Sequence, residues 1–145
     1  MRKTLMIFAL CIMSVLSASA ADGYSRNIAD LPVAARTMLK NNFKSKMSLI
    51  KIDKDWGRVS EYEVILNDGT EVKFDNSGNW KEVEVSESGS VPAKVIPAAI
   101  LKYVKTNHKG LRVIGIEKKR SGYEVELSNG LDMEFDARGN FLRYD

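Results

Sequence analysis

Acidic side chains at alternate positions are the residues with which this sequence could do chemistry. They recur at every second position in short runs that read as β-strands. Alternate residues of a strand lie on one face of a sheet, so these carboxylates should gather on one surface. The acidic candidates for binding a partner are Glu61, Glu63, Glu82, Glu84, Glu124 and Glu126. Such a surface would attract a basic partner, and this attraction mainly sets association rate and specificity.

Three aromatic residues are the candidate anchors for that partner. Alternation predicts Trp80 and Phe141 on the same face as the carboxylates, and it places Trp56 in a loop. Binding energy concentrates on aromatic side chains in such places. We rank Trp80 and Trp56 ahead of Phe141. The alternative is structural: a strand tryptophan is half-buried packing, and the charges keep a solvated face soluble and block strand addition.

The sequence offers no catalytic constellation, and we predict that the protein is not an enzyme. His108 is the only histidine, at a predicted helix end where it would cap carbonyl groups. Motifs of serine nucleophiles, zinc proteases and nucleotide-binding loops are missing. Paired carboxylates could act as acid and base, but a flat sheet gives them no pocket. We expect no cofactor and no metal, because the stretch 75–79 (DNSGN) is too short for an EF-hand loop and reads as a turn.

Residues 1–20 read as a cleaved signal peptide. Arg2 and Lys3 precede an apolar run at 4–16, and Ala18-Ser19-Ala20 forms a small-residue cleavage site. We expect the cut after Ala20, which leaves residues 21–145 as one domain in the periplasm or outside the cell. The apolar run is shorter than a transmembrane span, so we expect no membrane association of the mature chain.

The mature chain is nearly neutral and free of cysteine. The full chain has 22 Lys+Arg and 19 Asp+Glu, and the loss of Arg2 and Lys3 leaves 20 against 19. This balance gives no reason to expect a nucleic acid as partner. The single cysteine, Cys11, falls within the predicted signal peptide. Disulfides, thiol catalysis and cysteine-ligated metals are therefore excluded for the mature protein.

The sequence contains the same unit twice. Tyr62–Trp80 (YEVILNDGTEVKFDNSGNW) and Tyr123–Phe141 (YEVELSNGLDMEFDARGNF) are identical at nine of nineteen positions without gaps. Upstream, Leu31–Phe43 is echoed by Ile96–His108. Each copy, at about 27–86 and 91–145, predicts a proline-started helix followed by four short strands.

We therefore predict an α+β fold, in which tandem helix-plus-four-strand repeats form one antiparallel sheet with both helices on one face. A unit of about 50 residues can hardly bury a core alone, so the two sets of strands should join into eight. The other face of the sheet would be open and acidic. The first copy has three extra residues ahead of Tyr62, beside Trp56, and such insertions tend to fall in functional loops.

The proline-started helix and the pattern YEVxLxxGxxxxFDxxGNW resemble the PepSY-like, β-lactamase-inhibitor-like family of exported bacterial proteins. The resemblance covers most of the mature chain and is carried by Phe74-Asp75 with Gly78-Asn79-Trp80, and by Phe135-Asp136 with Gly139-Asn140-Phe141. It implies an exported domain. In the related inhibitors an open concave sheet grips an enzyme, and PepSY domains restrain peptidases. This chain lacks the inhibitors' disulfides, so we do not expect it to inhibit a β-lactamase.

Together these patterns predict an exported, non-enzymatic protein-binding module. It would engage another exported or envelope protein through the open sheet face, as an inhibitor or regulator of a peptidase or other envelope enzyme. The alternative is a module that binds a small ligand, a cationic peptide or the envelope surface on the same face. A further alternative lays the basic helices, with Arg36 and Lys40 in the first, on anionic lipid.

Overall fold

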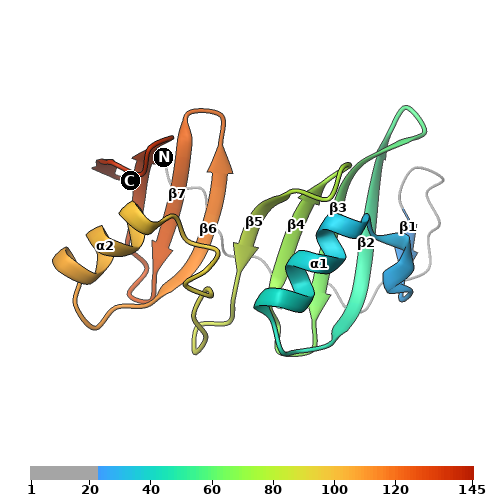
Figure 1. Cartoon of the computed structure of the whole chain (residues 1–145), viewed down its shortest axis with the longest axis horizontal. Helices are drawn as coiled ribbons and strands as arrows, with labels where there is room; N and C mark the ends of the chain where they lie inside the picture. Colours follow the sequence, from blue (N-terminus) through green and yellow to red (C-terminus); the bar gives the residue numbers. More distant parts are fainter. Residues whose placement is uncertain (1–22) are drawn as a thin grey trace.

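The computed structural model describes residues 23–145, which form one antiparallel sheet with two α-helices on one face (Figure 1). The predicted signal peptide lies outside the described residues. The helices are α1 (Val33–Asn42) and α2 (Ala98–Asn107), and a 3-10 turn, η1 (Ile28–Asp30), precedes α1. The strands follow chain order across the sheet: β1 (Gly23–Ser25), β2 (Met47–Asp55), β3 (Arg58–Leu66), β4 (Glu71–Asp75), β5 (Trp80–Glu84), β6 (Val113–Lys119), β7 (Gly122–Leu127), β8 (Asp132–Asp136) and β9 (Phe141–Tyr144).

The fold is mainly β, and the predicted α+β fold of tandem helix-plus-four-strand repeats is wrong. Each helix has ten residues and is therefore only roughly 15 Å long. Nine strands spaced about 4.8 Å apart form a much wider sheet, so strands dominate the architecture. The unpredicted strand is β1, which pairs Tyr24 with Lys51 at the edge. Its three residues are too few to give an alternating pattern that could be read from the sequence.

The hydrophobic core lies between the sheet and the two helices. Ala35 and Leu39 of α1 and Ile100 and Val104 of α2 are buried, and each pair has helical spacing. On the sheet side, one residue from each of seven neighbouring strands is buried and paired with the next. This core row is Ile50, Val64, Val72, Val83, Ile116, Val125 and Met133.

The two Asp-x-x-Gly-Asn segments are turns that join β4 to β5 and β8 to β9, and they pack against the helices. Asp75 Oδ1 accepts hydrogen bonds from the backbone N–H groups of Ser77 and Asn79, both at 2.9 Å. Asp136 makes the matching bonds in the second turn. These bonds close each turn through the aspartate carboxylate, as Asp side chains favour in turns.

Gly78 allows the first of these turns to lie directly against α1. Its φ is +89°, in the left-handed region, and a Cβ added there would lie 2.7 Å from Pro32 Cβ and 2.9 Å from the Ala35 nitrogen. Gly139 has φ +83°, and a Cβ added there would lie 2.9 Å from Ala99 Cβ in α2. Both positions therefore need glycine for the backbone angle and for the close approach of the helix.

The halves of the sheet that lie under α1 and α2 join where β5 pairs with β6, which we call the seam (Figure 1). The segment that follows β5 is held there by Arg112, whose guanidinium donates to the carbonyl of Glu87 at 2.9 Å and to that of Gly89. The paired residues of the seam are Glu82 with Glu117, Val83 with Ile116, and Glu84 with Gly115.

The β2–β3 hairpin reaches beyond the neighbouring strands β4 and β5 (Figure 1). At its tip Trp56 and Gly57 have φ values of +52° and +78°, the signs of a type I′ turn. Ile50 pairs with Val64, 14 positions later, whereas Ile116 pairs with Val125, 9 positions later. The first hairpin is thus five residues longer (14 against 9), rather than the predicted three.

The Gly78→Ala variant should lose roughly 2–4 kcal/mol of unfolding free energy, because the new methyl group clashes with α1 as well as straining the backbone. Gly69→Ala is the matched control, since Gly69 also has a positive φ of +86° but nothing within 4 Å of an added Cβ. It should lose only about 1 kcal/mol from strain. Urea unfolding followed by circular dichroism measures both, and equal losses would contradict the packing role.

Candidate functional site

The open face of the sheet carries a continuous row of paired residues, one from each strand, which we call the charge ladder. Residues directly opposite each other in an antiparallel sheet lie on the same face. The ladder neighbours the buried core row along every strand from β2 to β8, so it faces away from the helices. From β1 to β9 the ladder is Tyr24, Lys51, Glu63, Lys73, Glu82, Glu117, Glu124, Glu134 and Arg143.

A second row lies two residues further along each strand on the same face, and we call it the acidic row. It begins with the apolar residues Leu49 and Ile65 in β2 and β3. From β4 onward it is acidic except at one glycine, and it runs through the seam into the second half of the sheet. In order, these later members are Glu71, Glu84, Gly115, Glu126 and Asp132.

The two halves of the open face differ in how their charges are compensated. In the first half, acids and bases alternate along the ladder, and Lys73 Nζ lies 2.9 Å from Glu82. Lys81 adds a contact of 2.5 Å with Glu61. From Glu82 onward, four glutamates on adjacent strands face one another without an intervening base in the ladder. Acidic charge is therefore in excess at the seam and beyond it.

Two cations limit this excess from its margins. Lys119 Nζ contacts Glu117 at 2.9 Å and Glu124 at 3.0 Å, and Arg143 contacts Glu134 at 2.6 Å. Each of these pairs is partly exposed, and such pairs contribute little to stability. Within residues 23–145, no ion pair reaches Glu84, Glu126 or Asp132 of the acidic row.

Glu71 and Glu84 face each other directly across β4 and β5. Burial first, and neighbouring carboxylates second, raise the pKa of each to about 7: Glu63 and Glu84 act on Glu71, and Glu82 acts on Glu84. Glu63 itself is only 5% exposed, and its Oε1 has no hydrogen-bond partner among the described residues. Burial also raises the pKa of Glu63.

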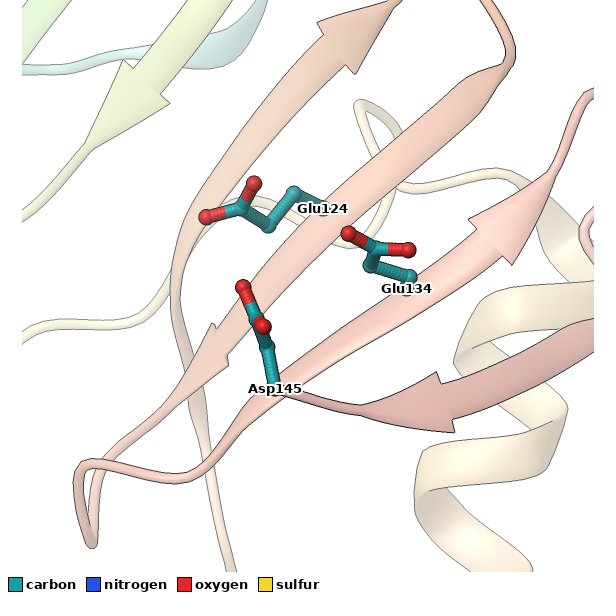
Figure 2. Close-up of side chains that lie close together, drawn as sticks. All are labelled: Glu124, Glu134 and Asp145. Atoms are coloured by element: carbon teal, nitrogen blue, oxygen red, sulfur yellow. The ribbon is translucent and has the colours of Figure 1, made fainter. Parts of the chain in front are cut away.

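Three carboxylates converge at the far end of the face (Figure 2). One oxygen each from Glu124, Glu134 and Asp145 lies within 4.8 Å of the others. Oxygen ligands from carboxylates suit a hard divalent cation such as Ca²⁺. Lys119 and Arg143 already contact Glu124 and Glu134, so a cation would have to displace them or share the carboxylates with them.

Trp80 and Phe141 lie on the helix-covered side rather than on the open face. Each lies directly before a β-bulge: Trp80 pairs with Phe74, which leaves Lys81 unpaired, and Phe141 pairs with Phe135, which leaves Leu142 unpaired. Phe141 stacks on Tyr103 of α2, with ring centroids 4.7 Å apart.

The ring of Trp80 packs against the core beneath Lys118, whose Nζ lies 3.8 Å from its centroid. One extra residue in a strand moves the next side chain to the other face, which alternation could not reveal.

Trp56 is the predicted anchor that the structure leaves free. It is fully exposed at the tip of the β2–β3 hairpin, away from the core. The six predicted glutamates do share the open face, with Glu61 and Glu63 on β3, Glu82 and Glu84 on β5, and Glu124 and Glu126 on β7.

Gly115 and Glu117 were missed by the sequence analysis, although both lie at the centre of the face. The face of β6 could not be assigned from its sequence, because Val113, Ile114 and Ile116 are all apolar and show no alternation. The available signal was a glycine inside a strand, which often marks a close approach of another group.

The comparisons with known proteins include one family model that matches more than half of the chain. A sequence model described as beta-lactamase-inhibitor-like and PepSY-like matches residues 60–143. The comparison with curated proteins gives no match. Within the described residues, neither helix is long and apolar enough to cross a bilayer.

Three solved structures resemble this one closely. A periplasmic protein of unknown function from Bacteroides vulgatus has 42% identity and a TM-score of 0.81, over 86% of this chain and 99% of that one. A calcium-regulated periplasmic protein from Bacteroides thetaiotaomicron has 39% identity and a TM-score of 0.78, over 86% and 96%. A second B. vulgatus periplasmic protein has 35% identity and a TM-score of 0.78, over 88% and 99%. All three carry the word "putative" in their descriptions.

The pair Glu71 and Glu84 should make the protein less stable as the pH rises. Their folded pKa values near 7 lie above the ordinary value of 4.5, so the folded state binds more protons between these values. The double variant Glu71→Gln/Glu84→Gln mimics the protonated pair. Its thermal midpoint should equal that of the wild type near about pH 4.5 and exceed it above about pH 7.

The exposed Asp55→Asn variant is the control and should follow the wild type at every pH. A gap between the double variant and the wild type that does not change with pH would contradict the assignment.

Proposed function

The chain belongs to the PepSY-like family, and from this premise and the charge of its open face we propose that it is an exported, non-enzymatic protein that binds and regulates another envelope protein. The observation that carries this proposal is the run of Glu82, Glu117, Glu124 and Glu134 on four adjacent strands, on the sheet face that no helix of the described residues covers. Directly opposed like charges destabilise a sheet, so this run costs folding stability that a basic partner would restore.

Export is supported by two independent observations. The sequence begins with a predicted signal peptide, and the three solved relatives are described as periplasmic proteins. The partner is therefore sought among periplasmic, secreted or envelope-bound proteins. A role as inhibitor or regulator of an envelope enzyme, such as a peptidase, is favoured by the inhibitor-like description of the family.

Trp56 supplies a second contact for such a partner. Its exposed indole stands on a turn that Gly57 completes, so the side chain is presented by a defined backbone. Large rigid aromatic side chains are enriched among residues that dominate binding energy. In this proposal the charges of the open face mainly set the association rate, and the contact of Trp56 at the hairpin tip mainly sets the residence time of the partner.

The test is affinity capture with the mature chain from its native envelope extract, followed by kinetics with the purified partner. Replacing Glu82, Glu117, Glu124 and Glu134 by Gln should abolish capture, and the association rate of the wild type should fall steeply with salt. The matched control replaces four exposed helix-side lysines, Lys40, Lys44, Lys102 and Lys105, by Gln, and should capture normally. Trp56→Ala should mainly raise the dissociation rate. Undiminished capture by the glutamate variant would refute the proposal.

A second candidate function is calcium binding on the same face. The convergence of Glu124, Glu134 and Asp145 favours it, and one relative is described as calcium-regulated. Calcium at these carboxylates would neutralise part of the acidic excess. It would thereby weaken the attraction for a basic partner.

Calorimetric titration with CaCl₂ tests this second function. The wild type should bind with a dissociation constant of roughly 0.1–1 mM, and the thermal midpoint should rise with calcium. Glu124→Gln and Asp145→Asn should remove both effects, while Glu61→Gln, on the same face but paired with Lys81, should keep them. No heat of binding up to saturating calcium would exclude the site.

A further inference from the structure

Gly115 is the only member of the acidic row from Glu71 to Asp132 that has no side chain, and it lies at the seam. On β5 it faces Glu84, and on β7 it faces Glu126. The equivalent place in the first half of the sheet, judged by register, is filled by Leu49. The missing side chain leaves a shallow depression lined by Glu82, Glu84, Glu117, Glu124, Glu126 and Asp132.

Gly115 is not required by the fold itself. Its φ lies outside the left-handed region, and an added Cβ would meet Glu126 Cβ at 3.5 Å and Glu126 Oε2 at 3.6 Å, which are ordinary contacts. Glycine within a strand weakens the strand, and it often marks a place where a ligand or another backbone comes close. Because sterics and backbone angle both permit a side chain here, the space above Gly115 remains to be explained.

The carboxylates around the depression suit a spread cationic group better than a single ion. Glu84 and Glu126 flank the glycine from the two neighbouring strands, each about 4.8 Å away in the sheet. In the described part of the chain, the carboxylate oxygens that converge closely enough for one metal ion belong to Glu124, Glu134 and Asp145. Glu84, Glu126 and Asp132 do not form such a group, and the carboxylate oxygen Oδ1 of Asp132 is buried without a partner.

Resting on the proposed function, we propose that the partner docks with an exposed arginine, whose guanidinium enters the depression over Gly115 between Glu84 and Glu126. A guanidinium is planar and carries five donors, so it can bond carboxylates on both sides at once. A glycine at this position lets another group come close to the strand backbone, and a flat guanidinium needs such a close approach to lie between the two carboxylates. The acidic face would attract any basic surface, and the depression would add specificity for a partner with an arginine at the matching position.

The test uses a synthetic peptide with arginine and serine at alternate positions, and a matched peptide in which citrulline replaces every arginine. Citrulline keeps the shape of arginine but removes its charge. Binding is followed at low salt by the backbone amide signals of the mature protein in heteronuclear NMR. The arginine peptide should shift the signals of Gly115 and its strand neighbours, and the citrulline peptide should not.

Two variants and two control variants then locate the contact. Gly115→Ala fills the depression without changing charge, and Glu84→Gln/Glu126→Gln removes the flanking charges; each should weaken the arginine peptide about tenfold or more. Gly23→Ala, at an open position in β1, and Asp53→Asn, on the compensated half of the same face where Asp53 pairs with Lys51, should change binding less than about twofold. Thermal melting confirms that each variant is folded.

The outcomes distinguish a failure of the arginine site at Gly115 from a failure of the proposed function of the open face. If Gly115→Ala binds the arginine peptide as the wild type does, or if Asp53→Asn weakens binding as much as Gly115→Ala does, the docking site is wrong. The open-face proposal then still stands if the four-glutamate variant loses the captured protein. If CaCl₂ shifts the Gly115 signal and the arginine peptide does not, a metal rather than an arginine occupies the depression, and the inference is overturned.

Discussion

The unbroken pairing of nine strands is the constraint on which the rest of this structure depends. Since each strand pairs with the next one along the chain, the position of one residue in the register fixes the face of its neighbours on every other strand. The core row and the charge ladder are two consequences of that one register. A slip of one residue at any pairing would exchange buried valines for glutamates, so the hydrophobic core also holds the charged surface in place.

The helices act on only one side of this arrangement. Gly78 and Gly139 bring the turns that end β4 and β8 against α1 and α2, which cover the apolar rows. Both helices lie on one face (Figure 1), and no helix of residues 23–145 covers the opposite face across the seam. The charge ladder is compensated by Lys51 and Lys73 on one half and is left acidic on the other. The first half therefore resembles an ordinary solvated sheet, while the seam and second half carry the properties of a recognition surface.

The sequence allowed the prediction of the hairpins, the helices and the shared face of six glutamates, because period-two alternation and Asp-Gly or Asn-Gly turns are local signals. The predictions were wrong where one extra residue interrupts the alternation of inward and outward side chains. Lys81 and Leu142 are the unpaired residues of β-bulges, and they send Trp80 and Phe141 to the covered side. Gly115 could be noticed but not interpreted, since its meaning depends on Glu84 and Glu126 from two other strands. The fold class failed for a simpler reason: the edge strand β1 is three residues long, and the helices are short relative to the sheet.

The two tryptophans make the protein its own spectroscopic reporter. Trp80 packs beneath Lys118 on the covered face, whereas Trp56 stands in solvent at a hairpin tip. Their fluorescence therefore originates from unlike surroundings, one following the packing of the molecule and the other following whatever approaches the tip. A soluble quencher such as iodide reaches Trp56 first. Emission from a single chain, without any attached dye, can thus distinguish unfolding from an encounter at the tip.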